Sequence, residues 1–209
     1  MLAAPGKADR QTIGIQMNKI IAVLTLCLLG TSLAQAATVS ATSCAAADVQ
    51  AALNLAKAGD TVLIPAGTAN WSQGVSWNAP QNVTIKGAGT TATGGGDQTV
   101  IIDDIPSGSP LLKISISSSG LMRLTGITFR SGSGAIKDNG TIKFEGPGNL
   151  RIDHCHIIAS TTANYKAVQF GSGVFGVMDS CILDFTGTHA LYFFNGRNEP
   201  GGGDWMGNY

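Results

Sequence analysis

A short segment recurs in the second half of this chain. It reads MRLTGITF at 122–129, LRIDHCHI at 150–157 and GVMDSCIL at 176–183. Successive copies are offset by 28 and 26 residues, and a weaker copy, QNVTIKG, stands at 81–87. Such a period is typical of chains that fold as a stack of similar units, each covering the apolar face of the next. The repeat therefore predicts a solenoid.

Local chemistry indicates the type of solenoid. Helical periodicity is scarce after residue 60, and the recurring Leu and Asn of leucine-rich repeats are missing. Each copy has alternate apolar positions, a bend, and a second short strand. Gly126, His154 and Ser180 occupy the bends, where we expect the left-handed backbone that glycine adopts freely. We therefore predict an all-β fold, a parallel β-helix whose coils stack at about 4.8 Å.

Aligned apolar residues predict ladders inside the coils. The aligned sets are Leu124, Ile152 and Met178; Ile127, Cys155 and Cys181; and Phe129, Ile157 and Leu183. The two cysteines would stand in neighbouring coils, at a separation that a disulfide accepts. Buried thiols without a disulfide are slightly favoured, because free Cys packs as a small hydrophobe.

One amphipathic helix precedes the strands. The segment 45–58 has apolar residues at helical spacing, with Ser43 as the expected N-cap and Gly59 after the last turn. A parallel solenoid needs a cover over its open end. We therefore assign residues 37–59 to an N-terminal capping α-helix and residues 60–209 to the coils.

The start of the chain indicates export. Lys19 precedes an apolar run at 20–30 that is too short to span a bilayer comfortably, and Ala34-Gln35-Ala36 supplies a small-x-small cleavage pattern. We expect a signal peptide at 17–36, cleavage after Ala36, and a secreted protein, extracellular or periplasmic. Residues 1–16 precede a second methionine, Met17, and are interpreted as an over-extended start.

Two segments resemble a known family. The run NLRIDHCHI at 149–157 and the run GDTVLIPAG at 59–67 are similar to the strand-bend-strand signature and the first coil of pectate-lyase-like proteins. The resemblance covers roughly residues 43–195 and implies a right-handed β-helix. It also implies a polysaccharide lyase that cleaves acidic glycans such as pectate by β-elimination, with an arginine base and calcium. The same superfamily includes non-catalytic adhesins and glycan-binding solenoids, so that alternative stays open.

Acidic residues follow the aligned apolar positions. Asp153 and Asp179 align in neighbouring coils, and Asp184 lies nearby in sequence. In the lyases of the resembling family, calcium is held by outward acids on one sheet, which makes these three the candidate calcium ligands. The alternative is that each Asp caps the adjacent bend or pairs with Arg123 or Arg151.

The last residues concentrate aromatic and charged side chains in a loop. The candidate glycan-binding residues are Arg197, Glu199, Asp204, Trp205 and Tyr209. Projecting loops carry binding surfaces, although a packed or disordered loop is an equal alternative. No segment here matches the family's Arg-x-Pro-x-x-Arg pattern, so catalytic residues stay unassigned. The chain stops in this loop, and we expect a β-helix truncated at its C-terminus.

Other partners are not expected. The run GSGVFG at 171–176 matches a dinucleotide fingerprint, but a repeat strand follows it instead of a helix. The formal net charge is zero, which gives no basic surface for nucleic acid. We therefore predict a monomer that binds polysaccharide and neither nucleotides nor nucleic acid.

Overall fold

Three parallel sheets make up most of this protein. The computed structural model describes residues 35–117, 120–134, 140–158, 166–171, 173–184 and 192–196. All of these except Gln35 belong to one compact unit, Ala36–Tyr209. Every strand pairing in the described part is parallel. The expected all-β class is confirmed, and the stacking is compatible with the expected β-helix.

The sheets are named here A, B and C. Sheet A holds β1 (Thr38–Ser40), β2 (Thr61–Leu63), β5 (Thr84–Lys86), β8 (Leu121–Thr125), β11 (Asn149–Asp153) and β14 (Phe175–Asp179). Sheet B holds β3 (Gly67–Trp71), β6 (Thr99–Asp103), β9 (Thr128–Ser131), β12 (His156–Ile158) and β15 (Ile182–Asp184). Sheet C holds β4 (Val75–Ala79), β7 (Leu112–Ile116), β10 (Ile142–Glu145), β13 (Lys166–Phe170) and β16 (Tyr192–Gly196).

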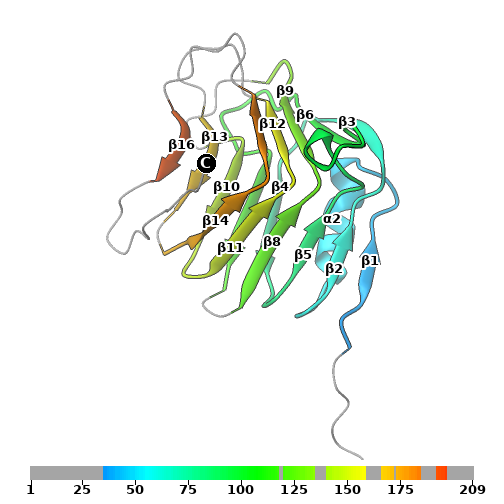
Figure 1. Ribbon diagram of the computed structural model, residues 1–209, viewed down its shortest axis with the longest axis vertical. Coiled ribbons are helices and arrows are strands. Elements are labelled where there is room, and N and C mark those ends of the chain that lie inside the picture. The colour runs from blue at the N-terminus through cyan, green and yellow to red at the C-terminus, as the bar shows by residue number, and fades with distance from the viewer. Residues whose placement is uncertain are drawn as a thin grey trace, which may run out of the picture. The chain divides into compact units, whose positions relative to one another are not determined.

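The chain visits the sheets in a fixed order. From β2 to β16 it passes from A to B to C and back to A, and each new strand pairs with the previous strand of its sheet. Figure 1 shows the strands of sheet A side by side in sequence order. Leu121 pairs with Asn149, and Asn149 with Phe175. These pairings confirm the repeat offsets of 28 and 26 residues.

The predicted ladders and bends are also confirmed. Leu124, Ile152 and Met178 stand in register and are buried. Between sheets A and B the chain turns through residues with positive φ: 70° at Gly126, 53° at His154 and 51° at Ser180. The left-handed bend therefore recurs in three neighbouring coils, although only one of the three residues is glycine.

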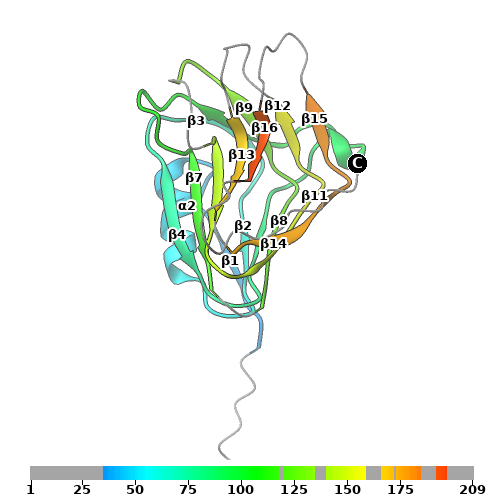
Figure 2. The same ribbon diagram turned by 90° about the vertical axis from the view of Figure 1, so that its left-hand side faces the viewer.

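The helix α2 (Ala46–Leu55) is shorter than predicted and is preceded by the strand β1. Its N-cap is Ala45, not Ser43, because the Ser43 hydroxyl accepts from Ala45 N–H and donates to Asp48 instead. Its buried side chains are Val49, Ala52 and Leu53. Figure 2 shows α2 beside β4, against which it packs.

Membrane-spanning helices are not found in the described part of the chain. No helix there has both the length and the apolar content to cross a bilayer.

Candidate functional site

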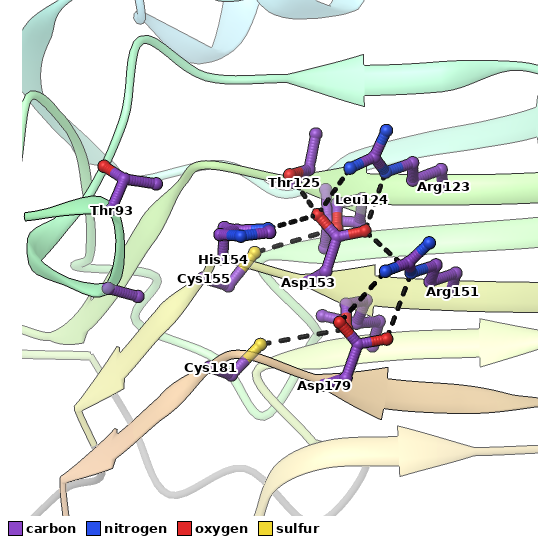
Figure 3. Close-up of polar contacts among 12 residues, drawn as sticks. Thr93, Arg123, Leu124, Thr125, Arg151, Asp153, His154, Cys155, Asp179 and Cys181 are labelled. Carbon is purple, nitrogen blue, oxygen red and sulfur yellow. Dashed lines mark hydrogen bonds and ion pairs between the residues drawn. The ribbon is translucent and has the colours of Figure 1, made fainter.

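A buried carboxylate lies on the outer side of sheet A. Asp153 ends β11 and is wholly buried, although its strand neighbour Arg151 is 41% exposed. Arg123 of β8 donates from Nε to Oδ2 at 2.7 Å and from Nη2 to Oδ1 at 2.9 Å. The Thr125 hydroxyl also donates to Oδ1, and Arg151 Nε lies 3.0 Å from Oδ2 (Figure 3). Neighbouring side chains thus cover an outward-directed aspartate.

The next residue extends this cluster. His154 Nδ1 lies 2.9 Å from Asp153 Oδ1, and the ring is 39% exposed. Burial alone raises the pKa of Asp153, but the hydrogen bonds from Arg123, Thr125 and His154 outweigh it and hold the pKa well below its usual range. An ionised carboxylate only accepts hydrogen bonds, so Nδ1 carries a proton. In the neutral ring, Nε2 is then the acceptor.

The same pairing recurs one coil further on. Arg151 donates from Nε and Nη2 to the two oxygens of Asp179, both at 3.1 Å. Each aspartate is therefore bound by an arginine of the preceding coil. Pairing with arginine is one of the two alternatives left open by the sequence, and it neutralises the stacked carboxylates without a metal ion.

A calcium ion does not fit this donor set. Calcium takes six to eight oxygen ligands, while the oxygens of Asp153 and Asp179 face guanidinium groups. The third candidate, Asp184, lies on β15 of sheet B rather than on sheet A. Among the residues that the structure describes, no group of three or more His, Cys, Asp or Glu side chains is placed to hold a metal.

An open hollow of about 330 Å³ adjoins the cluster. Its lining includes Lys86, Gly89, Thr93, Thr125 and His154. Lys86 and Thr125 pair in register on β5 and β8, and Thr125 pairs with Asp153 on β11. Lys86, Thr125 and Asp153 therefore form one column along the edge of the hollow.

The loop 87–98 makes the other wall. It contains the short helix η1 (Thr91–Thr93) and reaches across the coils, because Thr90 Oγ1 donates to the carbonyl of His154 at 2.6 Å. At the end of the loop, Asp97 Oδ2 lies 2.8 Å from His156 Nδ1. Burial raises the pKa of Asp97, but hydrogen bonds from Thr91 and His156 outweigh it and lower the pKa to about 2. His156 is not part of the lining of the hollow.

A strip of exposed side chains lies beside this cluster. Leu121, Asn149 and Phe175 begin β8, β11 and β14 and pair in register. Leu121 is 44% exposed and Phe175 is 54% exposed. Two residues further along the same strands lie Arg123 and Arg151. We call these five residues the outer strip.

The inner ladder contains the two aligned cysteines. Cys155 and Cys181 are free thiols, as slightly favoured from sequence. Each Sγ lies 3.8 Å from a backbone carbonyl oxygen of the preceding coil. The partner of Cys155 is Leu124, and the partner of Cys181 is Ile152. Burial raises the pKa of Cys155. A hydrogen bond from Cys155 lowers the pKa of Cys181.

Sequence reasoning found some of these residues and missed others. It singled out Asp153, His154 and the arginine alternative, but not Lys86, Phe175 or the loop wall. The candidate residues Arg197, Glu199, Asp204, Trp205 and Tyr209 lie outside the described residues.

Comparison with known proteins adds no family to this geometry. No family model, no curated protein and no solved structure matches the chain.

Proposed function

We propose that this chain forms a right-handed parallel β-helix of the pectate-lyase-like type, with α2 as its N-terminal cap. The fixed order of sheets A, B and C supports the coil. Parallel crossover connections are right-handed in nearly all known cases, which supports the handedness. The position of α2 against β4 and β1, before the repeated coils, supports the cap. Export after cleavage near Ala36 is part of the proposal.

We propose that the protein binds acidic polysaccharide along the outer strip. The exposed ring of Phe175 carries this proposal, because an aromatic ring exposed on the face of a sheet offers an apolar platform for a sugar face. Arg151 lies two residues further along the neighbouring strand, and Arg123 pairs with it on the next strand. Within the part of the chain that the structure describes, each guanidinium uses Nε and Nη2 on an aspartate, which leaves the Nη1 donors for a carboxylate of the glycan.

Binding to immobilised pectate tests this proposal. Phe175→Ala is expected to weaken binding at least tenfold, because it removes the platform. Leu55→Ala is the matched control, since Leu55 is an exposed apolar residue, 69% exposed, on α2; it should bind as the unchanged protein does. Equal binding of neutral glycans, or equal binding by Phe175→Ala, would contradict the proposal.

Lyase activity is the second candidate function. The pair of Asp153 and His154 at the hollow favours it, because an imidazole fixed by a carboxylate suits proton transfer. Hydrogen bonds to Asp153 and Asp179 raise the pKa of Arg123 and Arg151, which makes these two arginines less suited to act as the base. Release of unsaturated, ultraviolet-absorbing products from pectate, unchanged by a chelator, would support a lyase that needs no calcium. Binding without such products would instead support a non-catalytic glycan-binding protein.

A further inference from the structure

His154 stands at a backbone position that suits glycine. Its φ is 53°, and the equivalent residue of the preceding coil is Gly126, with a φ of 70°. A residue with a Cβ loses about 1–2 kcal/mol in this conformation. Such conformations cluster at functional sites, where the surrounding structure holds the strained backbone in place. The side chain of His154 is therefore the feature to explain.

The buried carboxylate fixes that side chain. Asp153 is wholly buried and holds His154 Nδ1 at 2.9 Å. Arg123 and Thr125 hold the carboxylate in turn. The ring therefore cannot rotate without breaking a hydrogen bond to a buried ion. In the neutral ring, Nε2 is then an acceptor of fixed orientation on a residue that lines the hollow.

A cation lines the same hollow. Lys86 is exposed, and it has no ion-pair partner among the residues described. Lys86 pairs with Thr125 on the next strand, and Thr125 pairs with Asp153 on the strand after that. Two strand spacings are about 10 Å, which leaves room for one sugar residue between the ammonium and imidazole groups. An imidazole and a cation thus border one open space.

We propose that this hollow is a reaction pocket for β-elimination, in which His154 Nε2 accepts the proton and Lys86 faces the developing negative charge. The proposal rests on the binding of acidic glycans proposed above. The C–H bond next to the uronate carboxylate breaks, and its proton passes to Nε2. The electron pair forms a carbon–carbon double bond as the bond to the glycosidic oxygen breaks. The leaving oxygen takes a proton from water. Asp153 is a positioning residue.

Turnover of pectate by the full chain tests the assignment. His154→Gly suits the positive φ and is expected to fold. Its kcat should fall at least a hundredfold while KM stays unchanged, and added imidazole should restore part of the rate. Lys86→Gln should lower kcat in the same way, without rescue by imidazole.

The matched control is Lys57→Gln. It removes an exposed lysine that does not line the hollow, and it should keep full turnover. Equal loss in Lys86→Gln and Lys57→Gln, or wild-type turnover in His154→Gly, would overturn the assignment. A chain that binds pectate and releases no unsaturated product would overturn it too and leave the proposed binding intact. A chain that binds no acidic glycan overturns both.

Discussion

Two neighbouring coils place nearly the same tripeptide at the same bend. One reads Asp153-His154-Cys155 and the next reads Asp179-Ser180-Cys181, and both aspartates receive two hydrogen bonds from an arginine of the preceding coil. Their surroundings differ. The Asp153 side chain is wholly buried and that of Asp179 is 31% exposed. Equivalent sequence positions therefore become a candidate reaction site in one coil and a surface ion pair in the other.

The difference has two local causes. Thr125 stands opposite Asp153 and adds a hydroxyl donor, and the loop 87–98 folds over the His154 bend. Within the described residues, no corresponding loop contact reaches Ser180. The repeat supplies the scaffold, while an interruption of the repeat supplies the site.

Removing each carboxylate tests this comparison most strongly. Asp153→Asn should lower the free energy of unfolding by about 2–3 kcal/mol, because a neutral amide loses the charge-assisted hydrogen bonds that the buried carboxylate accepts from Arg123 and its neighbours. Asp179→Asn should lower it far less, since water reaches that pair. Urea unfolding of both variants measures the difference. Equal losses would mean that burial of Asp153 does not matter.

Acid should destabilise the coil that contains Asp153, because this carboxylate becomes protonated. The pKa of Asp153 is lowered in the folded protein, so its contribution is complete above the unfolded-state pKa of about 4. It is lost as the pH falls from there towards the folded-state pKa. Unfolding free energy measured between about pH 3 and pH 6 should decline less in Asp153→Asn than in the unchanged protein. Parallel curves would contradict the assigned ion pair.

Thiol chemistry should separate the two cysteines. Cys155 is wholly buried with a raised pKa, whereas Cys181 is partly exposed with a lowered pKa. A thiolate is the reactive form, so a maleimide should label Cys181 at least tenfold faster in the native protein. Peptide mass spectrometry gives both rates, and labelling after denaturation is the control. Equal native rates would mean that the two ladder positions are equally open.

Glycine at the bends should give the smallest effect. Ser180→Gly removes the steric cost of a φ of 51°. Part of this gain is offset because glycine has a larger conformational entropy in the unfolded state. The free energy of unfolding should therefore rise by about 0.5–1 kcal/mol. His154→Gly gains the same relief but loses the hydrogen bond to Asp153, so its net change should be near zero. Thermal unfolding of the two variants checks this order.

The sequence predicted the all-β class and the alignment of the repeated strands well, because the repeat specifies their register. Aligning Leu124, Ile152 and Met178 placed three strands correctly, and it placed the bends at Gly126, His154 and Ser180. The helix was also predicted, but its start was wrong by one residue, its end by three and its N-cap by two. Strand β1 was missed, since three residues carry too little periodicity.

The site was less predictable because its contacts join distant, dissimilar segments. Thr90 binds the carbonyl of His154 across 64 residues of sequence, and Asp97 binds His156 across 59. Neither contact follows from the repeat. Lys86 could not be predicted from the sequence, because its place beside Thr125 follows only from the pairing of β5 with β8.

The recurrent left-handed bend gives this stack several equivalent positions for a functional side chain. Gly126, His154 and Ser180 share one backbone conformation, so a side chain can be exchanged at any of them without redirecting the strands on either side. Moving the imidazole from position 154 to 126 or 180 would displace it by one strand spacing, about 4.8 Å, along the stack. The position of a reactive side chain along the stack can therefore be changed in steps of one strand spacing, while the strands that border the substrate stay in place.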